Sequence, residues 1–110
     1  MNILDRFRLD GKVAVVTGGT KGLGKAMAEG LAAAGAQMAL ISRHGDEAGA
    51  VAAELSASSG QACRGYACDV TQPDQVDALI PQILKDFGQI DILINNAGIN
   101  LRGAIDELSV

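Results

Sequence analysis

Aromatic side chains and long apolar runs are scarce in this chain of 110 residues. It contains no tryptophan, one tyrosine and two phenylalanines, and it carries 13 acidic against 9 basic residues. Few rings and a net charge of −4 are atypical of proteins that bind nucleic acid or a membrane surface, which are usually basic. The longest apolar runs, 13–16 and 92–94, are far too short to span a bilayer.

Cysteine and histidine are equally sparse. Cys63 and Cys68 lie five positions apart, which on a strand places them on opposite faces and matches neither a redox C-x-x-C motif nor a metal site. Charged residues begin at Asp5 and Arg6, too early for the core of a signal peptide. We therefore expect a cytoplasmic protein with two buried thiols and with no nucleic-acid or membrane partner.

Short apolar runs alternate with helical patterns along the chain. The runs at 13–17, 38–41, 62–68 and 90–94 predict strands, and the helices between them are expected to end near Gly35, Gly60 and Gly88. The fourth run is apolar enough to be covered on both faces. Because every connection carries a helix, a parallel sheet in an α/β fold of order β-α-β-α-β-α-β is predicted.

The helical segments show their apolar positions at helical spacing. In the third helix these positions are Val76, Leu79, Ile80, Ile83, Leu84 and Phe87. In the first helix they are Leu23, Ala26, Met27, Leu31 and Ala34. Thr71 and Asp74 have the spacing of a capping box at the start of the third helix, and Pro81 is expected to kink that helix.

Glycine is abundant, with 14 residues, and it is concentrated after the first strand, where residues 17–24 read Thr-Gly-Gly-Thr-Lys-Gly-Leu-Gly. N–H groups at the start of a helix are unpaired and partly positive, so this loop predicts an anion site. A nucleotide hydrolase is disfavoured because Ala26 replaces the hydroxyl residue that holds magnesium. A methyltransferase-like site is disfavoured because Ser42 and Arg43, rather than an acidic residue, follow the second strand.

Four motifs, in the expected order, resemble the short-chain dehydrogenase/reductase family over nearly the whole chain. They are the pattern T-G-x-x-x-G-x-G at Thr17, Gly18, Gly22 and Gly24, the pair Asp69-Val70, the run Asn95-Asn96-Ala97-Gly98, and the lead-in Phe7-x-Leu9-x-Gly11-Lys12. The resemblance implies the N-terminal part of a Rossmann-type doubly wound parallel sheet with strand order 3-2-1-4.

The same resemblance implies a site for a dinucleotide. The glycine loop would face the pyrophosphate, Asp69 and Val70 would contact adenine, and residues 96–98 would line the ribose and nicotinamide, while Asn95 would bridge strands. The expected cofactor-binding residues are Thr17, Gly18, Thr20, Lys21, Gly22, Leu23, Gly24, Ser42, Arg43, Asp69, Val70, Asn96, Ala97 and Gly98. The alternatives are that Asp69 is an ordinary turn residue and that the asparagines only satisfy backbone groups at a strand end.

The charges after the second strand favour NADP(H) over NAD. A carboxylate there would bind the ribose 2′-hydroxyl and repel a 2′-phosphate. This chain instead has Ser42 and Arg43, and Lys21 is expected to approach the same point. The alternative is that Arg43 is solvated and that Asp46 or Glu47 reaches the ribose. The single histidine, His44, is interpreted as a residue of the rim.

The catalytic residues that the resemblance implies are not found in the 110 residues. They are a serine and a Tyr-x-x-x-Lys unit, in which the tyrosine is the acid/base, but the one tyrosine, Tyr66, is followed four residues on by Val70. We therefore interpret residues 1–110 as the N-terminal part of a dinucleotide-binding domain, inactive alone, from an oxidoreductase that interconverts alcohols and ketones. We expect a small alcohol or carbonyl substrate, with residues 98–103 resembling members that act on sugar acids and polyols, and a homo-oligomer.

Two other interpretations remain open. The chain could be a non-catalytic dinucleotide-binding module that is complete as it stands. It could also be a half-fold that functions only on association with another chain. The second of these would use the edge of the predicted fourth strand, whose apolar residues have no further strand beside them.

Overall fold

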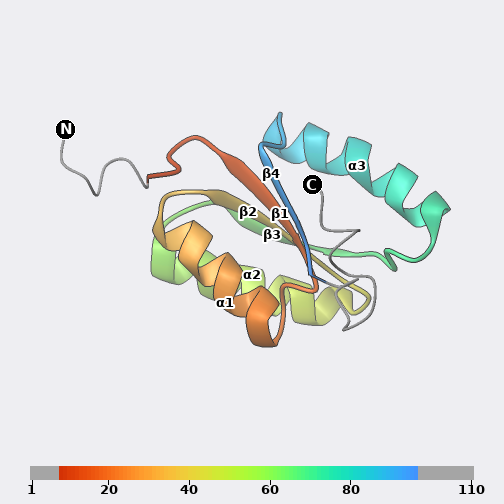
Figure 1. The fold of residues 1–110 in the computed structure, drawn as a ribbon, viewed down its shortest axis with the longest axis horizontal. Coiled ribbons are helices and arrows are strands. Elements are labelled where there is room, and N and C mark those ends of the chain that lie inside the picture. Colours follow the sequence, from red (N-terminus) through yellow and green to blue (C-terminus); the bar gives the residue numbers. More distant parts are fainter. Residues whose placement is uncertain (1–7, 97–110) are drawn as a thin grey trace.

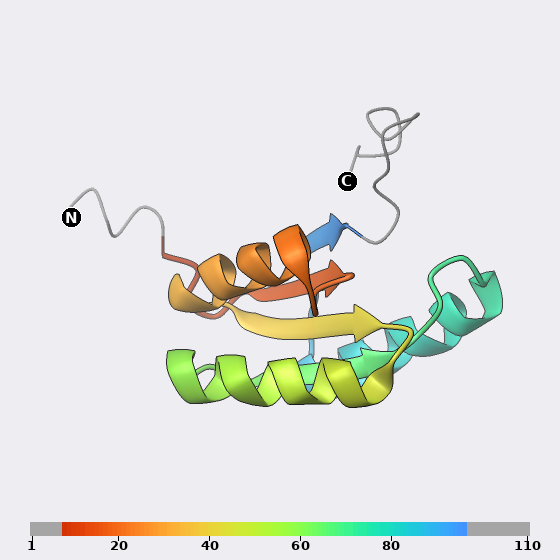
Figure 2. The ribbon, with the colours of Figure 1, turned by 90° about the horizontal axis from the view of Figure 1, so that it is seen from below.

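The computed structural model describes residues 8–96, which form a four-stranded parallel sheet with helices on both faces (Figures 1 and 2). In chain order the elements are β1 (Val13–Thr17), α1 (Gly22–Ala33), β2 (Gln37–Ser42), α2 (Gly45–Ser59), β3 (Cys63–Ala67), α3 (Pro73–Phe87) and β4 (Ile92–Asn95). The strand order is β3-β2-β1-β4, and all three pairings are parallel. The predicted fold class and the 3-2-1-4 order are confirmed.

β1 lies inside the sheet and is buried along its whole length. Each of its residues, from Val13 to Thr17, is at most 6% exposed. A short run of β-branched and small residues suits a parallel strand that helices cover on both faces. In register, Val15 lies between Ala39 of β2 and Leu93 of β4.

The sheet separates two apolar cores, because successive residues of a strand point to opposite faces. Ala14 and Val16 of β1 join the core beneath α1 and α2, whereas Val15 joins the core beneath α3. Figure 1 shows α1 and α2 on one face of the sheet and α3 on the other. Cys63 packs against the first core and Cys68 belongs to the second, so their predicted opposite orientation is confirmed; Cys68 is buried and Cys63 is half-buried.

α1 fully buries only small residues against the sheet, although Leu31 packs against the same core while partly exposed. Its buried positions are Gly24, Ala28 and Ala32, spaced four apart on one face. Leu23, expected on the apolar face, is 65% exposed. The helix was predicted correctly, but its buried face only in part: Leu31 packs against the core as expected, whereas the fully buried positions are small residues because helix and sheet approach closely.

α2 lies equally close to β3. A Cβ added to Gly65 of β3 would overlap the backbone of Ala48 in α2. The helix buries Ala48, Val51, Ala52 and Leu55, the positions that the sequence pattern indicates, and it ends at Gly60 with a positive φ of 75°. Gly65 therefore interrupts the apolar pattern of the third strand because it makes room for the helix backbone.

α3 begins differently from the prediction. Gln72 is its N-cap residue and Pro73 is in its first turn, so the expected capping box of Thr71 and Asp74 does not form. The Thr71 hydroxyl donates instead to Asp69 Oδ1 at 2.6 Å. The helix continues through Pro81 and ends at Gly88, which has the left-handed conformation that the sequence predicts at this position.

β4 is covered less completely than its sequence suggests. Ile92 and Ile94 pack against the first core, but Leu93 on the other face is 44% exposed. The prediction of cover on both faces is therefore wrong for the described part of the chain. The start of β4 is fixed to β1 by Asp91, whose N–H donates to the Val13 carbonyl at 2.9 Å and whose Oδ2 accepts from the Val13 N–H at 2.8 Å.

We predict that Asp91→Asn lowers the free energy of unfolding at neutral pH and reduces its acid sensitivity. The hydrogen bonds from the Val13 N–H and, less strongly, from Gln89 hold the pKa of Asp91 below 3.8. A lowered folded-state pKa contributes stability above the unfolded-state pKa, and this contribution is lost as the pH falls through the folded-state value. The difference in the free energy of unfolding between wild type and Asp91→Asn should therefore shrink as the pH falls below 3.8.

Urea denaturation of wild type and Asp91→Asn, carried out at neutral pH and again below pH 3.8, measures the difference in their free energies of unfolding. Asp77→Asn, which removes an exposed carboxylate from α3, is the matched control and should leave stability almost unchanged at both pH values. A constant difference between wild type and Asp91→Asn across the pH range would contradict the assignment.

Candidate functional site

The loop between β1 and α1 turns through two glycines in a conformation that L side chains rarely adopt. Gly18 has a φ of +66° and Gly22 a φ of +55°. The Gly18 N–H donates to the Ile41 carbonyl at 2.8 Å, which fixes the loop over the end of β2. Lys21 is the N-cap residue of α1, and its side chain makes no capping hydrogen bond. The first N–H groups of α1 are therefore available to an anion.

Gly24 is the point at which three segments of the chain meet. A Cβ at this position would overlap the carbonyl oxygen of Gly18 and would lie 2.6 Å from Nδ2 of Asn96. Asn96 Nδ2 donates to that same Gly18 carbonyl at 3.2 Å, although the two residues are 78 positions apart. The start of α1, the glycine loop and the end of β4 are thus packed with no room for a side chain between them.

A second contact joins the ends of β1 and β4. The Thr17 hydroxyl donates to Asn95 Oδ1 at 3.0 Å, and it lies 3.4 Å from the Ile94 carbonyl oxygen. Thr17 is 6% exposed, so this contact lies inside the fold. The predicted role of Asn95 as a bridge between strands is confirmed.

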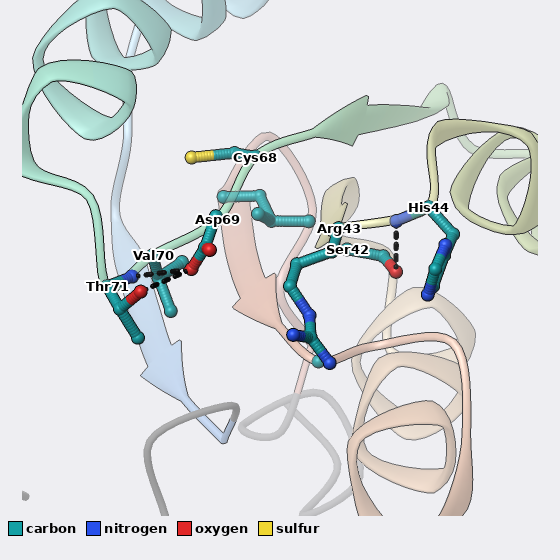
Figure 3. A pocket seen from close by; sticks show the side chains of 9 residues that line it. Ser42, Arg43, His44, Cys68, Asp69, Val70 and Thr71 are labelled. Carbon is teal, nitrogen blue, oxygen red and sulfur yellow. Dashed lines mark hydrogen bonds between the residues drawn. The ribbon is translucent and has the colours of Figure 1, made fainter.

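A cavity of about 410 Å³ lies beside the glycine loop, at the carboxyl ends of β2 and β3 (Figure 3). Its lining consists of Gly18, Ile41, Ser42, Arg43, His44, Cys68, Asp69, Val70 and Thr71. Open α/β sheets bind ligands at the carboxyl ends of their strands, because the loops there diverge and leave a crevice.

One wall of the cavity follows β2. Ser42 Oγ accepts a hydrogen bond from the His44 N–H at 3.1 Å, and His44 is the N-cap residue of α2. Arg43 lies between them on the exposed surface, and Figure 3 shows its side chain extending along this wall. A guanidinium at this position offers several donors in a fixed plane, a geometry that suits phosphate oxygens.

The opposite wall follows β3 and is acidic. Asp69 Oδ1 accepts hydrogen bonds from the N–H and the hydroxyl of Thr71, at 3.0 and 2.6 Å (Figure 3). These bonds, followed by the charge of Arg43, hold the pKa of Asp69 below its ordinary value. Asp69 is therefore ionised at neutral pH and acts only as an acceptor.

The structure brings together only part of the expected binding set. Of the predicted residues, the cavity lining includes Gly18, Ser42, Arg43, Asp69 and Val70. The others that are described lie outside the lining: Thr17, Thr20, Lys21, Gly22, Leu23, Gly24 and Asn96. Ala97 and Gly98 lie outside the described residues.

Lys21 is the clearest departure. Its Nζ pairs with Glu47 Oε1 of α2 at 3.4 Å, and its side chain is 80% exposed. Lys21 and Glu47 thus contact one another at the surface, and neither lines the cavity. The expected approach of Lys21 to the end of β2 is not made in this structure.

Sequence reasoning missed Ile41, Cys68 and Thr71 as lining residues, and it placed His44 only at the rim. Each of the four directly precedes or follows a predicted residue at the end of β2 or β3. The rule that neighbouring parallel strands end at the same edge of a sheet could have identified them. In residues 8–96 no cluster of three or more His, Cys, Asp or Glu side chains could hold a metal ion.

Residues 12–110 match the family described as short chain dehydrogenase, so the chain belongs to this family. A D-threitol dehydrogenase from Mycolicibacterium smegmatis is 44% identical over 104 residues, which cover 94% of this chain and 40% of that protein. A sorbose reductase from Candida albicans is 47% identical over 98 residues, which cover 89% of this chain and 34% of that protein. The chain therefore spans well under half the length of these relatives.

Solved structures share the fold. The L-sorbose reductase from Gluconobacter frateurii, complexed with NADPH and L-sorbose, matches with a TM-score of 0.80 and 39% identity over 92% of this chain and 40% of that one. A Haemophilus influenza protein with bound NAD matches with a TM-score of 0.79 and 34% identity over 92% of this chain and 36% of that one. Within the described part of the chain, every helix is too short or too polar to cross a membrane.

We predict that Gly24→Ala lowers the free energy of unfolding by about 1–3 kcal/mol, because the new methyl group would overlap the Gly18 carbonyl and force the loop away from α1. Gly30→Ala is the matched control: Gly30 lies in the same helix with nothing within 4 Å of an added Cβ. That substitution should stabilise the protein by about 0.5–1 kcal/mol. Urea denaturation measures both effects, and equal midpoints for the two variants would contradict the close packing at Gly24.

Proposed function

We propose that this chain is the dinucleotide-binding portion of an NADP(H)-dependent oxidoreductase that interconverts alcohols and ketones by hydride transfer. The observation that carries the proposal is the position of the cavity. It adjoins the glycine loop and has a guanidinium on one wall and an ionised carboxylate on the other. A 2′-phosphate and an adenine 6-amino group, both on the adenosine half of NADP(H), would complement these two walls.

The residues present fit such a cofactor. The N–H groups at the start of α1 lack a side-chain cap, and the glycines beside them leave space for a pyrophosphate, since nothing lies within 4 Å of a Cβ added at Gly22. In this proposal Gly18, Gly22 and Gly24 shape the loop, and Thr20, Lys21 and Leu23 supply its intervening backbone. Thr17 and Asn96 brace the loop from below through the contacts with β4.

The adenine end would lie at the carboxyl end of β3. Asp69 would accept from the 6-amino group and Val70 would offer its main-chain N–H. Ala97 and Gly98 are proposed, on family resemblance, for the ribose and nicotinamide. The chemistry that such a cofactor supplies when bound is the exchange of a hydride with an alcohol or carbonyl carbon.

The preference for NADP(H) rests on Arg43 and Ser42. No carboxylate lines the β2 wall of the cavity, so nothing among its described residues repels a 2′-phosphate there. The complex of the sorbose reductase with NADPH favours the same cofactor, whereas the relative with bound NAD makes NAD the alternative that the binding experiment must exclude. Glu47 does not support NAD binding, because it pairs with Lys21.

The substrate is proposed to be a small polyol or the corresponding keto sugar, as the names of the threitol, sorbose and mannitol enzymes among the relatives suggest. The serine and Tyr-x-x-x-Lys unit that the family resemblance implies are not in these 110 residues, so we propose that the chain alone is inactive. The free thiols of Cys63 and Cys68 fit a reducing, cytoplasmic setting.

A second candidate function is association with another chain, as a homo-oligomer or a half-fold. The observation that favours it is the exposure of Leu93 in β4, which is 44% exposed. Apolar residues exposed near a strand that ends a sheet favour pairing with a further polypeptide. This candidate is compatible with cofactor binding and does not replace it.

We predict that the chain binds NADP⁺ at least about tenfold more tightly than NAD⁺, because a charge-assisted contact between Arg43 and a 2′-phosphate is worth about 1.5–3 kcal/mol. Arg43→Gln should weaken NADP⁺ binding about tenfold and leave NAD⁺ binding nearly unchanged. Isothermal titration calorimetry at fixed ionic strength measures these affinities.

Arg64→Gln is the matched control, since Arg64 is an exposed cation of β3 that does not line the cavity. It should retain the wild-type preference for NADP⁺. Equal affinities of the wild type for NAD⁺ and NADP⁺ would exclude the proposed preference, and the absence of binding to both would exclude the dinucleotide site.

A further inference from the structure

We propose that Thr71 and Gln75 are positioning residues that make the cavity selective for a 6-amino purine, because they hold the Asp69 carboxylate in one orientation. The inference rests on the proposed dinucleotide site and adds to it. Asp69 and Val70 are the residues expected to contact the base. Thr71, which lines the cavity, and Gln75 act on Asp69 and are not among the expected binding residues.

The backbone of Asp69 is held from both sides. Its N–H donates to Gln75 Oε1 at 2.8 Å, and its carbonyl accepts from the Gln72 N–H at 3.0 Å. Gln75 lies in the first turn of α3, so the helix start reaches back to the end of β3 through this side chain. The direction in which the Asp69 side chain leaves the backbone is therefore set by α3.

The carboxylate itself is held by Thr71. Both the N–H and the hydroxyl of Thr71 donate to the same oxygen, Oδ1, as Figure 3 shows. Two donors on one oxygen oppose rotation about the bond between Cβ and the carboxyl carbon. Among the described residues, Oδ2 of Asp69 has no such partner, and Asp69 lines the cavity. One acceptor oxygen is thus left for a ligand, in a fixed orientation.

A fixed acceptor distinguishes adenine from hypoxanthine. The 6-amino group of adenine donates a hydrogen bond, whereas the 6-oxo group of hypoxanthine accepts one and would face an anionic oxygen without a proton between them. Hypoxanthine carries a donor at the neighbouring N1, which a carboxylate that rotates freely can reach. The restraint by Thr71 therefore adds to the selectivity that the Asp69 carboxylate and the Val70 N–H supply.

The test compares the binding of NADP⁺ with that of its hypoxanthine counterpart, nicotinamide hypoxanthine dinucleotide phosphate, by calorimetry on the whole 110-residue chain. The wild type should prefer the adenine form about tenfold or more, since a lost hydrogen bond that leaves a charged group unpaired costs about 1–3 kcal/mol. Thr71→Val, which keeps the shape and removes the hydroxyl, should lower this ratio about threefold to tenfold. Thr71→Ser, which retains the hydroxyl, should keep the wild-type ratio of the two affinities.

Gln75 provides an independent pair of variants. Gln75→Met removes the acceptor for the Asp69 N–H and should also lower the ratio, whereas Gln75→Glu keeps an acceptor oxygen and should preserve it. Unchanged ratios in both Thr71→Val and Gln75→Met would overturn the inference, and so would an equal loss of affinity for both dinucleotides, which indicates a merely structural role. Failure of the wild type to bind either dinucleotide would overturn the proposed function itself.

Discussion

The close contact at Gly24 is the constraint on which the rest of the site depends. Because no side chain fits between the start of α1 and the Gly18 carbonyl, the helix begins directly above the end of β1. The Asn96 amide binds the same carbonyl and brings the end of β4 to this point. The Gly18 N–H in turn holds the loop over the end of β2. The close approach of the backbone at Gly18 and Gly24 therefore places the start of α1, which has no side-chain cap, beside the cavity at the ends of β2 and β3.

The charges around the cavity are local and opposed, in a chain whose overall charge is −4. Arg43 and Asp69 follow neighbouring strands, and the Arg43 charge contributes to the lowered pKa of Asp69. A ligand that carries both a phosphate and a hydrogen-bond-donating amino group would satisfy both walls, whereas a ligand with only one of these groups would satisfy one wall. The net charge argues against nucleic acid and membranes as partners, whereas the positions of Arg43 and Asp69 at the ends of β2 and β3 support a dinucleotide.

The sequence predicted the strands, the helices and the glycine loop, because these depend on local patterns that Val13–Thr17 and Gly18–Gly24 display clearly. The strand order came from the family resemblance. Two features that the sequence did not predict depend on contacts between separate segments: Lys21 pairs with Glu47 of α2, and α1 buries Gly24 instead of Leu23. A third is a local competition, in which the Thr71 hydroxyl donates to Asp69, two residues earlier, instead of capping α3. In the first two cases a tertiary contact overrides the arrangement that local spacing favours, and in the third a turn within the loop before α3 does so.

We propose that one dinucleotide spans the glycine loop and the cavity at the carboxyl ends of β2 and β3. The most direct test is an NMR titration of the ¹⁵N-labelled chain with NADP⁺, followed through its backbone amide resonances. We expect the largest shifts at residues 18–24, 42–44 and 69–71 together, and small shifts in the second half of α2. Shifts confined to the edge of β4 beyond Asp91, or their absence at the glycine loop, would contradict the account.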